Sequence, residues 1–180
     1  MRLDDMKRGF DLTHADKSAV LIYFYPFKGS IYFPLILRPA YDGIHASQIS
    51  LPGGRMELSD TSILQTALRE ANEEIAIDPE RIQILGKLTE VYIPPSNYLV
   101  TPFVGSANYV PKFIPDPFEV EKVIAADIRM FFDKTLIREK TICVRDMAIQ
   151  APYFDISGQT VWGATAMILI ELKDIIESIE

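Results

Sequence analysis

A short run of charged residues carries the clearest chemical signature in this sequence. Arg69, Glu70, Glu73 and Glu74 lie within a stretch where apolar residues recur at intervals of three and four, which predicts a helix. The apolar stripe comprises Ile63, Leu64, Ala67, Leu68, Ala71 and Ile75. Because successive turns bring such positions together, we expect the three glutamates to converge on one point. Like charges at this spacing repel one another, whereas Mg²⁺ or Mn²⁺ binds hard oxygen ligands and accepts phosphate oxygens, so the run predicts a metal site for pyrophosphate chemistry.

A glycine pair upstream strengthens this interpretation. Gly53 and Gly54 lack a Cβ, so the backbone there can adopt positive φ and approach a ligand closely. The Gly53 carbonyl oxygen then becomes a candidate ligand for the same metal. The alternative is that the glutamates form a solvated acidic helix face, as charge runs commonly do.

The segment over residues 51–77 resembles the box of the Nudix hydrolase family, G-x5-E-x7-R-E-U-x-E-E-x-G-U, in which U is a bulky aliphatic residue. Gly54 matches the leading glycine, and residues 69–74 match the catalytic run. Asp60 replaces the first glutamate, with one extra residue before Arg69, which resembles the branch of the family that hydrolyses coenzyme A. Ala76 replaces the glycine at the helix exit, where glycine normally adopts the left-handed conformation, so we expect a modest cost in stability.

Motifs outside the box resemble the same coenzyme A pyrophosphatase branch and follow in the same order. They are Arg38 with the H-x-x-Q segment from His45 to Gly54, the strands of residues 85–88 and 92–105, the D-P-F-E-V of residues 116–120 and the W-G-A-T-A of residues 162–166. The resemblance implies a Nudix-type α/β/α sandwich with a mixed β-sheet. It also implies hydrolysis of coenzyme A or an acyl derivative to 3′,5′-ADP and a 4′-phosphopantetheine product. ADP-ribose or another nucleotide-sugar remains open as substrate, as does a non-catalytic ligand-sensing domain.

The resemblance also implies roles for the residues of the box. The Gly53 carbonyl with Glu70, Glu73 and Glu74 would bind Mg²⁺ or Mn²⁺, and Glu70 could instead orient the attacking water. The guanidinium of Arg69 is suited to hold the acidic cluster by forked hydrogen bonds, a role that we favour over direct catalysis.

Further candidates lie outside the box. Glu119 is either a metal ligand or general base, as its match to the N-P-x-E-V motif implies, or a solvated surface residue. Arg38 and His45 are candidate substrate-binding residues, although a histidine in such a segment often serves packing or lies at the surface. Trp162 could stack on a base, but an aromatic residue at the start of an apolar helix is expected in the core.

Composition limits the classes of protein that fit. The chain has 180 residues, of which 48% are hydrophobic, which suits a single domain over residues 1–180. A formal net charge of −7 argues against a general nucleic-acid surface and favours a small nucleotide substrate bound through a metal. Cys143 is the only cysteine, and the apolar run over residues 19–27 is too short to span a membrane, so we expect a cytoplasmic protein without membrane association. A homodimer is left open.

Alternating apolar runs and turn residues predict the elements that must position the site. Strands are expected over residues 19–25, 31–37, 82–92, 98–106, 119–125, 136–144 and 148–154. Besides the box helix, a short helix is expected over residues 127–132 and a longer one over residues 161–179. Together these elements favour a mixed sheet between helices.

Overall fold

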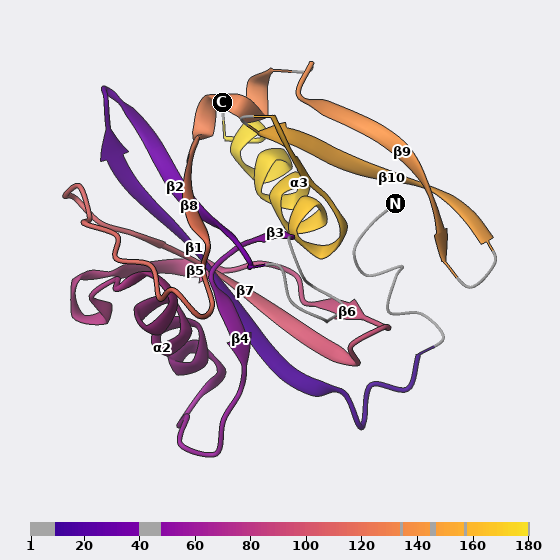
Figure 1. Cartoon of the computed structure of the whole chain (residues 1–180), viewed down its shortest axis with the longest axis horizontal. Helices are drawn as coiled ribbons and strands as arrows, with labels where there is room; N and C mark the ends of the chain where they lie inside the picture. Colours follow the sequence, from indigo (N-terminus) through magenta and orange to yellow (C-terminus); the bar gives the residue numbers. More distant parts are fainter. Residues whose placement is uncertain (1–9, 40–47, 134, 145–146, 157, 180) are drawn as a thin grey trace.

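The computed structural model describes residues 10–39, 48–133, 135–144, 147–156 and 158–179, and its elements are shown in Figure 1. The helices are α2 (Ile63–Ile75), α3 (Gly163–Glu177) and the 3₁₀ segments η1 (Pro79–Arg81) and η2 (Ile128–Phe132). The strands are β1 (Asp16–Phe27), β2 (Ser30–Leu37), β3 (Ile49–Ser50), β4 (Gly53–Arg55), β5 (Gln83–Lys87), β6 (Val91–Ile93), β7 (Tyr98–Ser106), β8 (Lys122–Asp127), β9 (Ile137–Val144), β10 (Met147–Ile156) and β11 (Gln159–Val161).

An eight-stranded mixed sheet forms the centre of the fold. Its main path runs β3-β2-β1-β7-β5, and β4 pairs with β1, β6 with β7 and β8 with β2. Strands β1 and β7 are parallel, with Asp16 opposite Tyr98 and Phe24 opposite Ser106, whereas the other pairs are antiparallel. The predicted mixed sheet is therefore confirmed. Strands β9, β10 and β11 form a separate three-stranded antiparallel sheet, which the sequence did not predict as a second sheet.

The alternating side chains of β1 divide the core into two layers. Leu21 and Tyr23 pack in one cluster with Ala71 and Ile75 of α2. Ile22 points to the other face, where its cluster includes Phe33, Leu35 and the α3 residues Ala166, Ile168, Leu169 and Leu172. Because successive residues of a strand face opposite sides of a sheet, α2 and α3 must cover opposite faces, as Figure 1 shows. The predicted α/β/α sandwich is confirmed.

Both ends of α2 have identifiable caps. Ser62 precedes the helix, and its hydroxyl accepts a hydrogen bond from the N–H of Gln65 at 3.2 Å. Ala76 ends the helix with φ 56° and ψ 37°, and its N–H donates to the Asn72 carbonyl at 2.8 Å. The left-handed exit predicted from the replaced glycine is thus present, with alanine in a conformation that favours glycine.

The predicted strand over residues 82–92 is interrupted. The ladder between β5 and β7 shifts register between Ile84 and Gly86, and β6 begins only at Val91. Between these strands, the N–H and hydroxyl of Thr89 donate to the Glu171 carboxylate of α3, at 3.1 and 2.7 Å. This long-range contact replaces ladder hydrogen bonds, which a local apolar pattern could not reveal.

Other boundaries also differ from the prediction. The strand expected at residue 119 begins at Lys122, because the N–H groups of Glu119 and Val120 both donate to the Asp116 carbonyl and form a turn. The helix expected at residue 161 begins at Gly163, because Val161 pairs with Phe154 in β11. The short helix over residues 127–132 is the 3₁₀ segment η2.

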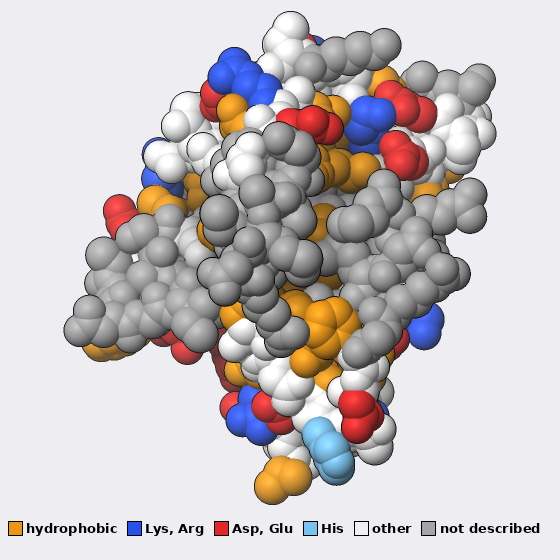
Figure 2. Space-filling view, turned by 90° about the vertical axis from the view of Figure 1, so that its right-hand side faces the viewer, with side chains coloured by type: hydrophobic (Ala, Val, Ile, Leu, Met, Phe, Trp, Pro, Cys, Tyr) orange, Lys and Arg blue, Asp and Glu red, His pale blue; other side chains and the backbone are white. Residues whose placement is uncertain are grey.

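The remaining observations concern membrane-spanning helices and the charge on one face of the molecule. Among the described residues, no helix combines the length and apolar character needed to cross a bilayer. On the face shown in Figure 2, acidic and basic side chains are interspersed among apolar ones. This face therefore carries charge of both signs.

Candidate active site

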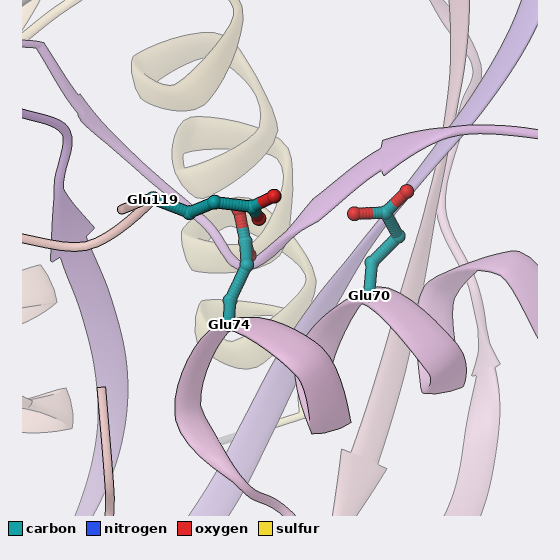
Figure 3. A group of neighbouring side chains, drawn as sticks. All are labelled: Glu70, Glu74 and Glu119. Carbon is teal, nitrogen blue, oxygen red and sulfur yellow. The ribbon is translucent and has the colours of Figure 1, made fainter. Parts of the chain in front are cut away.

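Three carboxylates from two separate segments meet beside α2. Glu70 and Glu74 lie on that helix and Glu119 lies in the turn that precedes β8 (Figure 3). One oxygen from each side chain lies within 4.8 Å of the others. Glu74 is 1% exposed, Glu70 is partly buried and Glu119 is exposed, so the cluster extends from the protein interior to the solvent.

The end of α2 positions Glu119. The N–H of Ile114 donates to the Ile75 carbonyl at 3.2 Å, and the N–H of Asp116 donates to the Glu74 carbonyl at 2.9 Å. These bonds pair carbonyls that a helix leaves unpaired at its C-terminus. The Asp116 carbonyl then accepts from the N–H of Glu119 at 3.2 Å, and Val120 is anchored in the core at 2% exposure. The turn over residues 116–120 is thereby fixed against the helix that carries Glu70 and Glu74.

The buried Glu74 carboxylate is hydrogen-bonded on both oxygens. Its Oε2 accepts from the Gly53 N–H at 2.8 Å, and its Oε1 accepts from Nη2 of Arg38 at 3.0 Å. Burial raises the pKa of Glu74 to about 8, with further upward contributions from Glu70 and Glu119, although Arg38 and the Gly53 N–H lower it. Burial also raises the pKa of Glu70. Burial and the neighbouring carboxylates thus favour the uncharged form of Glu74, and a bound cation would favour its charged form.

Both glycines of the pair make close contacts, with backbone atoms at Gly53 and with the end of a side chain at Gly54. Gly53 has φ 150°, and a Cβ there would lie 2.2 Å from the Ala19 carbonyl oxygen of β1. A Cβ on Gly54 would lie 2.5 Å from the carboxylate of Glu70. The pair thus lets β4 pack against β1 on one side and lets Glu70 approach the backbone on the other.

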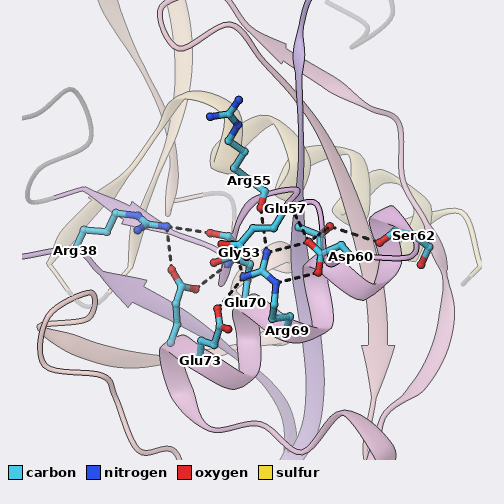
Figure 4. Close-up of polar contacts among 11 residues, drawn as sticks. Arg38, Gly53, Arg55, Glu57, Asp60, Ser62, Arg69, Glu70 and Glu73 are labelled. Atoms are coloured by element: carbon cyan, nitrogen blue, oxygen red, sulfur yellow. Dashed lines mark hydrogen bonds and ion pairs between the residues drawn. The ribbon is translucent and has the colours of Figure 1, made fainter.

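Arg69 is the centre of a network that fixes the helix against β4 (Figure 4). Its Nε and Nη2 donate to the two carboxylate oxygens of Asp60, both at 3.0 Å, and Nη2 also donates to the Arg55 carbonyl at 3.1 Å. Its Nη1 donates to Glu73 at 2.8 Å and forms an ion pair with Glu70 at 3.0 Å. A guanidinium engaged on all three nitrogens supports the predicted orienting role over a direct contact with substrate.

Asp60 is a positioning residue that the sequence-based site did not include. It is 7% exposed and accepts from the Glu57 N–H and the Thr66 hydroxyl, each at 2.9 Å, as well as from Arg69. The hydrogen bonds from Arg69 hold the pKa of this carboxyl well below its usual range. Its place at the first acidic position of the box was the signal that could have identified it.

The remaining predicted residues have different positions. Glu73 is not part of the three-carboxylate group in the structure, because its side chain is 53% exposed and bonded to Arg69. Arg38 is turned inward onto Glu74, and His45 lies outside the described residues. The prediction of a core position for Trp162 is wrong, since its side chain is 36% exposed and Val161 takes the buried position before it.

An open pocket adjoins the cluster. It has a volume of about 910 Å³, and its lining includes Glu70, Asp60, Lys17 and Arg55. Pockets of several hundred cubic ångströms accommodate ligands of nucleotide size.

Comparison with known proteins identifies the family. Residues 16–127 match the NUDIX domain family, a range that contains all three clustered carboxylates. The chain is similar to a protein of Pectobacterium atrosepticum described as an uncharacterized Nudix hydrolase, NudL, with 36% identity over 132 residues, 71% of this chain and 66% of that protein. It is also similar to mitochondrial Nudix hydrolase 15 of Arabidopsis thaliana, with 32% identity over 166 residues, 88% of this chain and 58% of that protein. The matches thus span less than two thirds of the length of either relative.

Solved structures agree on the fold. A Nudix hydrolase from M. smegmatis, RenU, superimposes with a TM-score of 0.64 at 15% identity, covering 92% of this chain and 88% of that one. The Nudix domain of Shewanella oneidensis NrtR, complexed with ADP ribose, gives a TM-score of 0.51 at 17% identity, covering 71% and 84%. With the family match over residues 16–127 and relatives named as Nudix hydrolases, the chain belongs to the Nudix hydrolase family.

Proposed function

We propose that this chain is a metal-dependent pyrophosphatase that cleaves nucleoside diphosphate derivatives and prefers coenzyme A or an acyl-coenzyme A. The observation that carries the proposal is the meeting of Glu70, Glu74 and Glu119, with ligand atoms within 4.8 Å of one another, inside the matched Nudix domain.

The donor set fits a hard divalent cation such as Mg²⁺ or Mn²⁺. Carboxylate oxygens are the ligands that these ions prefer. The surrounding network contains more carboxylates than guanidinium groups. Arg38 and Arg69 form ion pairs with Asp60, Glu70, Glu73 and Glu74, and Glu119 adds a fifth carboxylate. Glu70, Glu74 and Glu119 would hold the ion together with the Gly53 carbonyl, and Glu73 would lie farther out beside Arg69. When bound, the ion would offset the negative charge that develops on the phosphate oxygens.

Proton transfer and positioning of the carboxylates would fall to residues of the chain. Glu119 is exposed at the solvent side of the cluster, which suits it to accept a proton from the attacking water. The water oxygen attacks one phosphorus, the bridging P–O bond breaks, and the two products leave as 3′,5′-ADP and 4′-phosphopantetheine. Asp60 and Arg69 hold α2 against β4, so the carboxylates keep their relative positions while charge develops.

The coenzyme A preference rests on the motifs outside the box. One of them, the turn over residues 116–120, lies at the carboxylate cluster and supplies Glu119. Arg38 and His45 were predicted to bind substrate, and Gly43 stands where the branch usually carries an arginine.

A cytoplasmic location and a homodimer stay predictions from the sequence.

A substrate panel tests this proposal. Purified protein is incubated with Mg²⁺ or Mn²⁺ and with coenzyme A, acetyl-coenzyme A, ADP-ribose or nucleoside triphosphates, and the products are identified by mass. The proposal predicts 3′,5′-ADP from coenzyme A in a reaction that requires the metal. Cleavage of ADP-ribose without cleavage of coenzyme A would contradict coenzyme A as the substrate but would be consistent with pyrophosphatase activity. Lack of cleavage of every compound would contradict the activity itself.

A further inference from the structure

Arg38 contacts two groups that the sequence assigns to the metal. Its Nη2 donates to the Gly53 carbonyl oxygen at 3.1 Å and to Oε1 of Glu74 at 3.0 Å (Figure 4). The Gly53 N–H closes the arrangement by donating to Oε2 of Glu74 at 2.8 Å. One arginine, one backbone unit and one carboxylate thus form a connected group.

The backbone around Arg38 is itself fixed. The Arg38 N–H donates to the Gln48 carbonyl at 3.0 Å, and the preceding Leu37 carbonyl accepts from the Glu121 N–H at 2.9 Å. The Arg38 side chain is 23% exposed, in contrast to 62% for Arg55 on β4. Arg38 is therefore partly buried, and its Nη2 is engaged with Gly53 and Glu74, whereas an arginine that captures substrate phosphate needs donors that face the incoming ligand.

Loss of Arg38 would release the two oxygens that it holds. Glu74 is 1% exposed, so its Oε1 would lose a charged donor at a buried position. Each carboxylate oxygen has two lone pairs, so an oxygen that accepts from Arg38 or Gly53 can still offer the second pair to a cation. Groups that orient metal ligands in this way typically change metal affinity or activity by about 10–100-fold when they are removed.

We infer that Arg38 is a positioning residue that holds the Glu74 carboxylate and the Gly53 carbonyl in place for the divalent ion, and does not bind the substrate. This inference rests on the proposed function, because it assumes that Glu74 and Gly53 face the metal. The sequence predicted that Arg38 binds the substrate. The inferred role instead concerns metal binding and needs no bound nucleotide.

Mn²⁺ binding to the substrate-free protein, measured by titration calorimetry, gives the first test. Arg38→Gln should weaken binding by about tenfold, and Arg38→Lys, which keeps the charge, should recover part of the loss. The matched control is Arg138→Gln, which removes an arginine 55% exposed on β9 and should leave Mn²⁺ binding unchanged. Circular dichroism establishes that each variant is folded, and Arg38→Lys carries the comparison if Arg38→Gln is not.

Kinetics and a double-mutant cycle complete the test. Arg38→Gln should lower kcat by at least about tenfold and change KM for the nucleotide by less than about twofold. If Arg38 acts through Glu74, adding Arg38→Gln to Glu74→Gln should weaken Mn²⁺ binding little further. Unchanged or tighter Mn²⁺ binding in Arg38→Gln, or an increased KM with Mn²⁺ binding unchanged, would overturn the inference. Wild-type protein that binds Mn²⁺ but cleaves no nucleotide would instead contradict the proposed function, while the Mn²⁺ comparison would still decide the role of Arg38.

Discussion

Glu119 completes the carboxylate cluster from outside the box helix. Its turn is fixed by the Asp116 N–H, which donates to the Glu74 carbonyl, so backbone bonds rather than side-chain reach set its position. The sequence indicated this residue only through its motif, because no local pattern reports that residues 116–120 pack on the end of α2. Periodicity also places Glu73 near Glu70 and Glu74, but it does not reveal that the Glu73 carboxylate bonds to Arg69, outside the three-carboxylate group.

Substitution of Glu119 tests its proposed role as base or ligand. Glu119→Gln should lower kcat by about 100-fold and leave KM nearly unchanged, because proton transfer matters mainly in the transition state. Glu121→Gln is the matched control and should be nearly silent, since Glu121 is exposed and contacts β2 through its backbone N–H. Similar effects of both substitutions, measured by steady-state kinetics, would show that Glu119 is a solvated surface residue without a role in the reaction.

The Asp60–Arg69 pair should make stability depend on acid. Arg69 lowers the pKa of Asp60 in the folded protein, so the pair stabilises fully above the unfolded pKa of about 4, and this contribution is lost as pH falls through the folded value. Asp60→Asn should cost about 3 kcal/mol at pH 7 because it breaks a buried pair. In urea unfolding, the difference in free energy of unfolding between wild type and Asp60→Asn should shrink as pH falls below about 4.

The control for this pH effect is Asp155→Asn. Asp155 approaches Arg138 only at 3.8 Å, and both side chains are partly exposed, so the substitution should cost less than about 1 kcal/mol. A wild-type to Asp60→Asn difference that stays constant down to the acid limit would show that Asp60 does not act through its charge.

Among the elements, α2 was the most predictable, and it ends at a non-glycine residue in the left-handed conformation. The apolar stripe and the glycine pair defined this helix in the sequence, and the replaced glycine indicated the left-handed Ala76. Strand β5 was less predictable, because the Thr89–Glu171 contact with α3 interrupts the apolar run that suggested one strand. The short strands β3 and β4 also lacked a periodic signal, since their positions depend on pairing with β2 and β1.

The helix exit provides a stability prediction. Ala76→Gly should raise the free energy of unfolding by about 1 kcal/mol. The left-handed conformation costs an L-residue about 1–2 kcal/mol, and glycine avoids this cost but loses more backbone entropy on folding. Ala71→Gly, in the interior of the same helix, should lower it. Denaturant unfolding measures both, and a destabilised Ala76→Gly would mean that the exit strain is relieved in another way.

At the scale of the whole molecule, the site is assembled from segments that are distant in sequence. The end of β2 supplies Arg38, β4 supplies Gly53, α2 supplies Glu70 and Glu74, and the turn before β8 supplies Glu119. The motifs predicted the fold and most of these residues because they mark positions where backbone and chemistry are both constrained. They could not predict the inward turn of Arg38, which depends on its long-range contacts with Gly53 and Glu74.

The proposed preference for coenzyme A would be a property of the assembled site. Because Gly43 replaces the arginine of the branch, kcat/KM for coenzyme A should depend only weakly on the ribose 3′-phosphate, and Gly43→Arg should restore part of that dependence through a charge-assisted contact. The comparison is kcat/KM for coenzyme A against dephospho-coenzyme A in both proteins. An identical ratio in the two proteins would show that residue 43 does not meet the 3′-phosphate.

The most direct test of the central claim is Glu74→Gln, measured for Mn²⁺ affinity and for hydrolysis of coenzyme A in the same preparation. The substitution keeps the shape of the side chain and replaces the carboxylate that is proposed to bind the metal with a neutral amide, so far-ultraviolet circular dichroism should be unchanged. The account predicts that Mn²⁺ binding weakens and that turnover falls by orders of magnitude, about 100-fold or more. A folded Glu74→Gln protein that binds Mn²⁺ and hydrolyses coenzyme A at the wild-type rate would contradict metal-dependent catalysis by this carboxylate cluster.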